Sequence, residues 1–214
     1  MSIRWKNVIF DLDGTLANTV PLILASYEYA LREVLDQPLD VQLAKTWIGR
    51  TLRAAFTEHA PEHAAELEHE YLKFNAIHLS DMVTEFPGIP ELLADLREAG
   101  ANLGVVTAKR RSVAIDTLAP AKLPADLPIA AAMEDTTSHK PNPEPILIGM
   151  KNIGADPAES VYVGDAIYDL QAAAAAGISG VGVTWGAGVP EQVRAQANVG
   201  IADTVDELRA ILFN

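Results

Sequence analysis

Short runs of consecutive apolar residues recur along the chain and alternate with segments of helical composition. The runs cover residues 5–10, 102–107, 129–133, 160–163 and 181–185. Runs that are apolar without interruption are typical of strands buried on both faces, as in a parallel sheet covered by helices. The helical segments between them cover residues 90–99, 112–118, 143–153 and 166–176. This order predicts an α/β fold with a doubly wound, Rossmann-like parallel sheet as its core.

One long segment breaks the alternation of strands and helices. Between about residues 16 and 83 no strand pattern is found, and Ala, Leu and Glu are frequent. Pro21, Pro38 and Pro61 stand at plausible helix starts and turns. A structureless loop of this length is improbable inside a compact domain, so we expect a separate helical layer over the sheet. The predicted organisation is a discontinuous core of residues 1–15 and 84–214, with residues 16–83 as a helical insertion after the first strand.

The composition narrows the classes of partner. The 214 residues are 49% hydrophobic, which is enough to bury a core, and 16 basic residues against 29 acidic ones give a net charge of −13. Such a charge opposes binding to nucleic acid or anionic lipid over most of the surface. The absence of cysteine excludes disulfides and cysteine-ligated zinc. With only a short apolar run before Asp11, we expect a soluble cytoplasmic protein without signal peptide or membrane span; its oligomeric state is not predicted.

Two carboxylates follow the first predicted strand. Asp11 and Asp13 are two residues apart, so their side chains project to the same side if the chain stays extended. Open α/β sheets bind ligands at the carboxyl ends of their strands, where both acids would lie. Carboxylates this close repel each other, and a bound Mg²⁺, which prefers oxygen ligands, would let both act. Gly14 permits a sharp turn directly after them.

A second pair of acids follows a later predicted strand. Asp165 comes directly after the run 161–164, and Asp169 lies four residues further on. On a helix the two would share a face, and at its N-terminus negative charge is favoured by about 0.3 to 1 kcal/mol. The ordinary alternatives are turn formation by Asp11 and Asp13 and helix capping by Asp165. Capping, however, explains only one acid of the later pair.

Four stretches, in this order, resemble the motifs of the haloacid dehalogenase-like phosphatases. Residues 11–16, Asp-Leu-Asp-Gly-Thr-Leu, resemble the first motif, and Thr107 at the end of a predicted strand matches the second. Lys140 matches the third motif, in a loop stiffened by the prolines that follow it, and residues 161–169 match the fourth. Residues 134–145 also look similar to phosphoglycolate phosphatases and their pyrophosphatase relatives.

The resemblance implies a magnesium-dependent hydrolase of a small phosphate compound, either a phosphoglycolate-like ester or pyrophosphate. It implies that Asp11 attacks phosphorus to give an aspartyl-phosphate, while Asp13 donates a proton to the leaving oxygen and then activates water. The implied catalytic residues are Asp11, Asp13, Thr107 and Lys140. The implied metal ligands are Asp11, Asp13 (through its carbonyl) and Asp165, with Asp169 supporting the metal or Lys140. The implied substrate-binding residues are Gly14, Thr107, Ala108 and Lys140.

The resemblance also identifies the insertion as the family's C1 cap, which closes over the site and excludes water. Residues 49–52 fall where such caps often reach the active site, so Arg50 is a candidate for gripping a substrate anion. Lys109 and Arg110, beside the second motif, are similar candidates. The ordinary alternative for Arg50 is a solvent-facing side chain.

Three other functions stay open at this point. A phosphomutase of the same superfamily would use the same nucleophile, but mutases of this kind usually carry a histidine where this chain has Ile23. A phospho-receiver domain also carries aspartates, Thr and Lys on a parallel sheet, although it needs no helical insertion. A non-catalytic ligand-binding descendant of the fold is disfavoured by the four intact acids. Turnover of a generic aryl phosphate would eliminate that last alternative.

Overall fold

A six-stranded parallel sheet forms the centre of the computed structural model, which describes residues 2–196 and 198–214. Its order is β5-β4-β1-β6-β7-β8. The strands are β1 (Asn7–Phe10), β4 (Asn102–Val106), β5 (Ile129–Ala131), β6 (Ser160–Gly164), β7 (Ser179–Val183) and β8 (Gly200–Ala202). The chain runs outward from β1 to β5 on one side, then returns and runs from β6 to β8 on the other. The carboxyl end of β1 therefore lies where the winding reverses, the place where open α/β sheets bind ligands.

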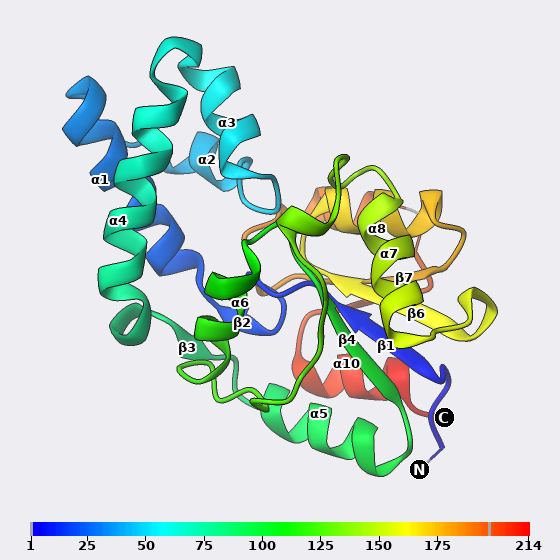
Figure 1. Cartoon of the computed structure of the whole chain (residues 1–214). Helices are drawn as coiled ribbons and strands as arrows, with labels where there is room; N and C mark the ends of the chain where they lie inside the picture. Colours follow the sequence, from blue (N-terminus) through cyan, green and yellow to red (C-terminus); the bar gives the residue numbers. More distant parts are fainter. Residues whose placement is uncertain (1, 197) are drawn as a thin grey trace.

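Helices cover both faces of the sheet (Figure 1). One face packs against α5 (Ile89–Glu98) and α10 (Val205–Leu212), and the other packs against α7 (Glu144–Ile153) and α8 (Ile167–Ala175). The helices α6 (Arg111–Leu118) and α9 (Pro190–Ala195) belong to the same alternation. The predicted doubly wound α/β fold is thus confirmed.

The uninterrupted apolar run of β1 follows from this layering. Val8 and Phe10 pack in one hydrophobic cluster with side chains of α5 and α10. Ile9 points to the opposite face and packs in another cluster with α7 and α8. All three residues are at most 1% exposed. A strand buried on both faces needs apolar residues at every position, which is the pattern that predicted it.

The structure contains elements that the apolar pattern did not predict. β8 and α10 continue the alternation beyond residue 185, the end of the last predicted strand. A short antiparallel pair, β2 (Ala17–Asn18) with β3 (Thr84–Glu85), joins the two ends of the inserted segment. The expectation of no strand between residues 16 and 83 therefore differs from the structure at β2, because two residues are too few to show a hydrophobic period.

The segment between β2 and β3 is helical and has its own core. It contains α1 (Val20–Leu35), α2 (Val41–Lys45), α3 (Leu52–His59), the 3-10 helix η1 (Pro61–His63) and α4 (Ala64–Met82). Tyr27, Trp47, Phe56 and Tyr71 form an aromatic centre with ring centroids 4.9 to 6.4 Å apart. In Figure 1 these helices stand as a group beside the sheet. The remaining 3-10 helices are η2 (Met133–Asp135) and η3 (Pro157–Glu159).

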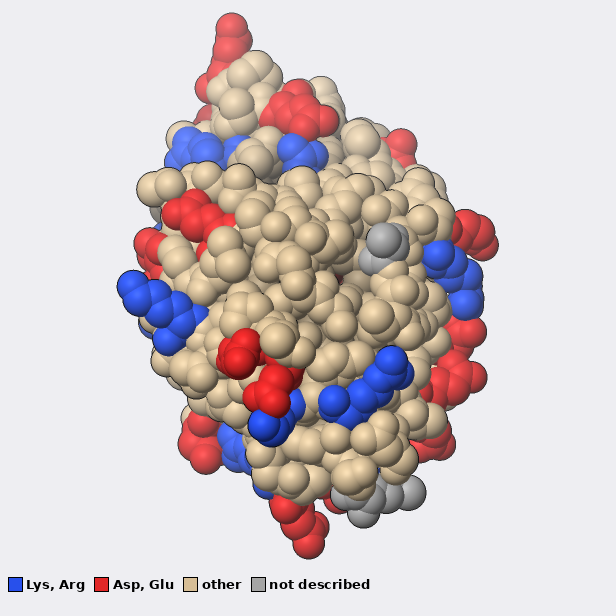
Figure 2. Space-filling model, turned by 90° about the vertical axis from the view of Figure 1, so that its right-hand side faces the viewer, with Lys and Arg blue, Asp and Glu red and all other residues tan. Residues whose placement is uncertain are grey.

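The surface agrees with the acidic composition. On the face shown in Figure 2, Lys and Arg side chains are scattered among Asp and Glu and form no continuous basic patch. None of the helices in the described ranges is both long enough and apolar enough to cross a membrane.

Candidate active site

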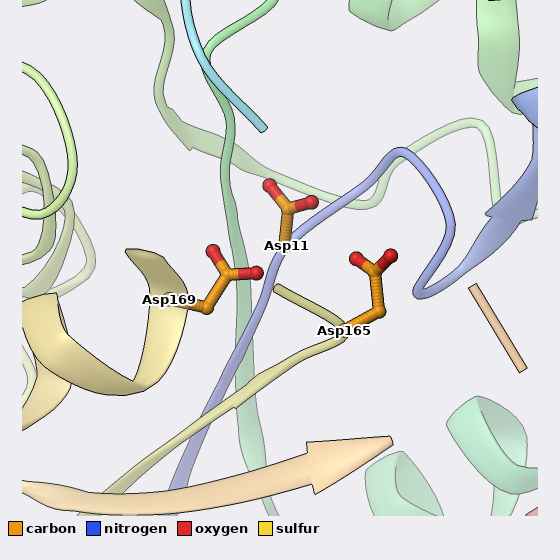
Figure 3. A group of neighbouring side chains, drawn as sticks. All are labelled: Asp11, Asp165 and Asp169. Carbon is orange, nitrogen blue, oxygen red and sulfur yellow. The ribbon is translucent and has the colours of Figure 1, made fainter. Parts of the chain in front are cut away.

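Three buried carboxylates converge at the carboxyl ends of β1 and β6. Asp11 follows β1, Asp165 follows β6, and Asp169 lies in the first turn of α8. One oxygen of each lies within 4.8 Å of the others, and the three residues are at most 2% exposed. Figure 3 shows the side chains approaching one another from these separate segments. The parallel register of β1 and β6 places Phe10 opposite Val163, which brings the two strand ends side by side.

The charge of this cluster favours a bound cation. Burial raises the pKa of Asp11 well above its usual range; the Lys140 ammonium opposes this shift, and Asp169 and Asp165 add to it. Burial likewise raises the pKa of Asp165 to about 7, with the charge of Asp169 as the next cause. Three carboxylates against one ammonium leave negative charge that a hard divalent ion with oxygen ligands would balance. The residues present therefore fit an ion such as Mg²⁺.

Lys140 is enclosed by hydrogen-bond acceptors. Its ammonium lies 2.8 Å from Asp11 Oδ1, 2.6 Å from Asp169 Oδ1 and 3.1 Å from the Tyr162 hydroxyl, so all three of its donors are used. The Tyr162 hydroxyl in turn donates to the Val106 carbonyl at 2.9 Å. The sequence analysis did not identify Tyr162 as a site residue. A tyrosine hydroxyl within an otherwise apolar buried strand is nevertheless a signal, because a buried hydroxyl needs a hydrogen-bond partner.

Asp165 is fixed through both of its carboxylate oxygens. The Thr15 hydroxyl donates to Oδ1 at 3.1 Å, and the Ala187 backbone N–H donates to Oδ2 at 2.8 Å. Gly14 and Gly186 approach so closely that a Cβ would lie 2.5 and 2.1 Å from Oδ2. The loop after β7 thus helps to hold this acid. That role was not predicted, because the local sequence around a loop glycine does not show whether the glycine packs against a carboxylate.

Gly14, predicted to bind substrate, has a different environment in the structure. Its backbone N–H donates to the Ala17 carbonyl at 2.9 Å, and its φ of +80° is one that favours glycine. It packs on Asp165, and it is not among the described residues that line the cavity over Asp11. The structure therefore shows Gly14 in a turn, as its residue type suggested, and its predicted substrate-binding role stays a prediction.

Asp13 stands apart from the three clustered acids. Its Oδ1 accepts a hydrogen bond from the Lys109 ammonium at 2.6 Å, and both side chains are mostly buried. Asp11 and Asp13 line the same cavity, as expected from their spacing, but the Asp13 side chain is not a member of the carboxylate group of Asp11. Lys109, a candidate for gripping a substrate anion, is thus bonded to an acid of the site itself.

A cavity of about 680 Å³, counted with its open mouth, lies over Asp11. Its floor includes Asp11, Asp13, Thr107 and Ala108, and its opposite wall comes from α1, α3, α4 and the turn before α3. The Thr107 hydroxyl accepts from the Lys109 N–H at 3.1 Å, which leaves its own proton free to donate into the cavity. The structure therefore brings the first, second, third and fourth matched motifs to one place.

Two predicted arginines line the cavity and both are paired. Arg50 contacts Glu58 at 2.6 Å. Arg110, which precedes α6, contacts Glu68 of α4 at 2.9 Å and so connects the core to the inserted helices. Glu68 also contacts Arg53 at 2.8 Å. The substrate-gripping role of Arg50 stays a prediction, since its guanidinium is held here by a neighbouring acid.

Comparison with known proteins places this chain in a family. The family model described as haloacid dehalogenase-like hydrolase matches residues 8–183. The sequence is 33% identical to a pyrophosphatase PpaX of Bacillus pumilus over 180 residues, which cover 84% of this chain and 83% of that protein.

Solved structures show the same fold. A predicted phosphatase from Clostridium acetobutylicum superposes with a TM-score of 0.85 at 25% identity, covering 96% of this chain and 97% of that one. A predicted phosphoglycolate phosphatase from Haemophilus somnus superposes with a TM-score of 0.82 at 24% identity, covering 97% and 98%. The resemblance inferred from the four motifs is confirmed by these matches.

Proposed function

The chain belongs to the haloacid dehalogenase-like hydrolases, and from that premise we propose that it is a magnesium-dependent phosphatase acting on a small phosphate compound. The observation that carries the proposal is the position of Asp11, a buried carboxylate at the floor of a cavity and in contact with Lys140. The candidate substrates are a phosphate monoester and pyrophosphate. The second is favoured by the name of the Bacillus pumilus relative.

Asp11 is the proposed nucleophile. Its carboxylate would attack phosphorus, forming an aspartyl-phosphate while the bond from phosphorus to the leaving oxygen breaks. Water would then break the bond between phosphorus and the Asp11 oxygen, releasing phosphate and regenerating the carboxylate. The Lys140 ammonium would fix Asp11 and offset the charge that develops on the phosphoryl oxygens, together with the Thr107 hydroxyl and the Ala108 N–H.

Asp13 is the proposed general acid and base. The Lys109 contact engages its Oδ1 and leaves Oδ2 to exchange a proton. In the first step Asp13 would give its proton to the leaving oxygen, and in the second it would take one from the attacking water. The cavity lining supports this role, because Asp13 and Asp11 border the same space.

The proposed metal ligands are the carboxylates of Asp11 and Asp165 and the carbonyl of Asp13. When bound, Mg²⁺ would supply positive charge that aligns the phosphoryl group and balances its oxygens. Asp165 is held in place by Thr15 and the Ala187 N–H. Asp169 would act on Lys140, to which it is hydrogen-bonded, rather than on the ion directly.

Residues 16–83 are the proposed cap over a core of residues 1–15 and 84–214. The separate aromatic cluster of α1 to α4 supports this division, as does a cavity lined from both parts. Closure of the helices over Asp11 would exclude water from the phosphoryl transfer.

Trapping of the phosphorylated enzyme tests the nucleophile. The wild-type protein, mixed with Mg²⁺ and acetyl phosphate and quenched within one turnover, should carry phosphate on the peptide that contains Asp11. Asp11→Asn should carry none and should not turn over, with an unchanged circular dichroism spectrum. Full turnover by Asp11→Asn, or label on another residue, would overturn the assignment.

A further inference from the structure

The cavity over Asp11 has a largely apolar outer wall. Ile23 of α1, Trp47 and Ile48 before α3, and Leu72 of α4 all line it, and all belong to or pack on the hydrophobic cluster of the inserted helices. A phosphoryl group seated at Asp11 would direct its leaving group toward this wall. The wall offers dispersion contacts and excludes water, and it provides little solvation for a second ionised group.

The charges around the cavity are already balanced by neighbours. Among the described lining residues there are as many cations as acids: Arg50, Lys109 and Arg110 against Asp11, Asp13 and Glu68. Each cation contacts a carboxylate, in the pairs Arg50–Glu58 at 2.6 Å, Lys109–Asp13 at 2.6 Å and Arg110–Glu68 at 2.9 Å. A leaving group with its own negative charge would have to break one of these pairs to find a partner.

Two tyrosines that line the cavity have hydroxyls for which no hydrogen-bond partner is found among the described residues. Tyr27 and Tyr71 are 1% and 5% exposed, line the cavity and have ring centroids 4.9 Å apart. Burial raises the pKa of both hydroxyls, and the charge of Asp13, which lines the same cavity, adds to both shifts. No hydrogen bond joins either hydroxyl to another residue within 2–196 and 198–214. An acceptor on a ligand in the cavity would give each of these hydroxyls a hydrogen-bond partner.

We propose that the leaving group is a neutral organic alcohol, with an apolar body against Ile23, Trp47 and Leu72 and an acceptor oxygen near Tyr27 and Tyr71. This inference rests on the proposed phosphatase function and specifies its substrate class: a monoester of such an alcohol, rather than pyrophosphate or an ester with a carboxylate. The bond from phosphorus to the alcohol oxygen breaks as the bond to Asp11 forms, and the alcohol leaves with the proton of Asp13.

A series of alkyl phosphates tests the apolar body. Ethyl, butyl and hexyl phosphate have leaving alcohols of similar acidity, so differences in kcat/KM report contact with the wall. We expect kcat/KM to rise about two- to fourfold per methylene, and to be higher for hexyl phosphate than for phosphoglycolate or pyrophosphate. Leu72→Ser should flatten this rise. Ile77→Ser, at a 64% exposed position of the same helix, is the matched control and should keep it.

The outcomes separate this inference from the function on which it rests. Turnover with a flat or falling alkyl series, or with pyrophosphate or phosphoglycolate as the best substrate, would overturn the inference and leave the phosphatase assignment intact. No hydrolysis of any of these compounds with Mg²⁺ present would overturn the assignment itself. If the Leu72 variant does not fold, the kcat/KM values of the wild-type protein for the three alkyl phosphates still decide the question.

The hydroxyls are tested with an ether analogue of hexyl phosphate in which oxygen replaces one methylene. The ether oxygen is placed in turn at each position of the substrate's alkyl chain. At one position we expect Tyr71→Phe or Tyr27→Phe to lower kcat/KM about tenfold more for the ether than for hexyl phosphate, mainly by raising KM. Tyr29→Phe, on α1 but outside the lining residues, should show no such difference. Equal responses of ether and alkyl substrates to the tyrosine variants at every position would refute the acceptor site.

Discussion

The Lys140 ammonium donates a 2.8 Å hydrogen bond to Asp11, a residue 129 positions earlier in the chain, and both side chains are almost fully buried. The bond joins the loop before α7 to the end of β1. Burial raises the pKa of Asp11, the proposed nucleophile at the floor of the cavity, and the adjacent ammonium opposes that shift. The stability of the core and the chemistry of the site therefore depend on the same contact.

Lys140→Met should destabilise the protein strongly. Removing one partner of a buried ion pair leaves uncompensated charge, here on Asp11 and Asp169, and typically costs about 3–5 kcal/mol. Lys122 pairs with Glu85 at 2.9 Å on the surface, and Lys122→Met should cost less than about 1 kcal/mol. Urea unfolding at pH 8 measures both. Equal losses in the free energy of unfolding for the two variants would show that the buried Lys140 ion pair matters no more for stability than a surface pair.

Gly186→Ala should weaken metal binding. The added Cβ would lie 2.1 Å from Asp165 Oδ2 and 2.5 Å from the Gly14 carbonyl oxygen, so Asp165 has to move. Displacing a ligand or its support typically lowers metal affinity by about 10- to 100-fold. Calorimetric titration with Mg²⁺ measures the change. Gly200→Ala is the control, because the three atoms nearest to its added Cβ all belong to the Ile211 side chain; a loss of the same size there would contradict the explanation.

The stabilisation by Mg²⁺ should increase with pH. The pKa of Asp165 is raised to about 7 in the folded protein from an ordinary 3.8, so the folded state holds this proton more tightly than the unfolded chain does. In the absence of metal, protonation of Asp165 therefore stabilises the folded protein. This contribution is fully present below about pH 4 and is lost as the pH rises toward about 7. A bound cation replaces the proton above that range.

Thermal unfolding at pH 5 and pH 8, with and without millimolar Mg²⁺, measures this linkage. We expect the increase in Tm on adding Mg²⁺ to be several degrees larger at pH 8. Asp165→Asn should reduce both the pH dependence of the metal-free protein and the effect of Mg²⁺. The same Mg²⁺ effect at both pH values in the wild-type protein would contradict the proposed ligand.

Arg110→Gln should impair closure of the inserted helices over the site. Arg110 connects the core to Glu68 of α4, whereas Arg53 contacts the same Glu68 from within the inserted helices. We expect kcat/KM to fall about three- to tenfold for Arg110→Gln and to change less than twofold for Arg53→Gln. Because both arginines are partly exposed, neither change should cost more than about 1 kcal/mol of stability. An equal decrease in kcat/KM for the two variants would show that the effect comes from loss of a partner of Glu68, and not from loss of the contact between the core and α4.

The sequence by itself determined the α/β fold and the position of the acids at strand ends. Both follow from local pattern: an uninterrupted apolar run such as 8–10 needs cover on two faces, and the residue after such a strand lies at the ligand-binding edge. The four motifs also identified the family. The short pair of β2 with β3 was beyond this reasoning, since two residues carry too little periodicity, and β8 was not predicted either.

Only the tertiary structure decided which side chains touch. The contact of Tyr162 with Lys140, the closeness of Gly186 to Asp165, and the separation of Asp13 from the other acids depend on strand register and on how loops far apart in sequence pack together. A shift of one residue in register would turn each strand side chain to the other face of the sheet. The walls of the cavity are likewise made by helices whose positions no local pattern specifies.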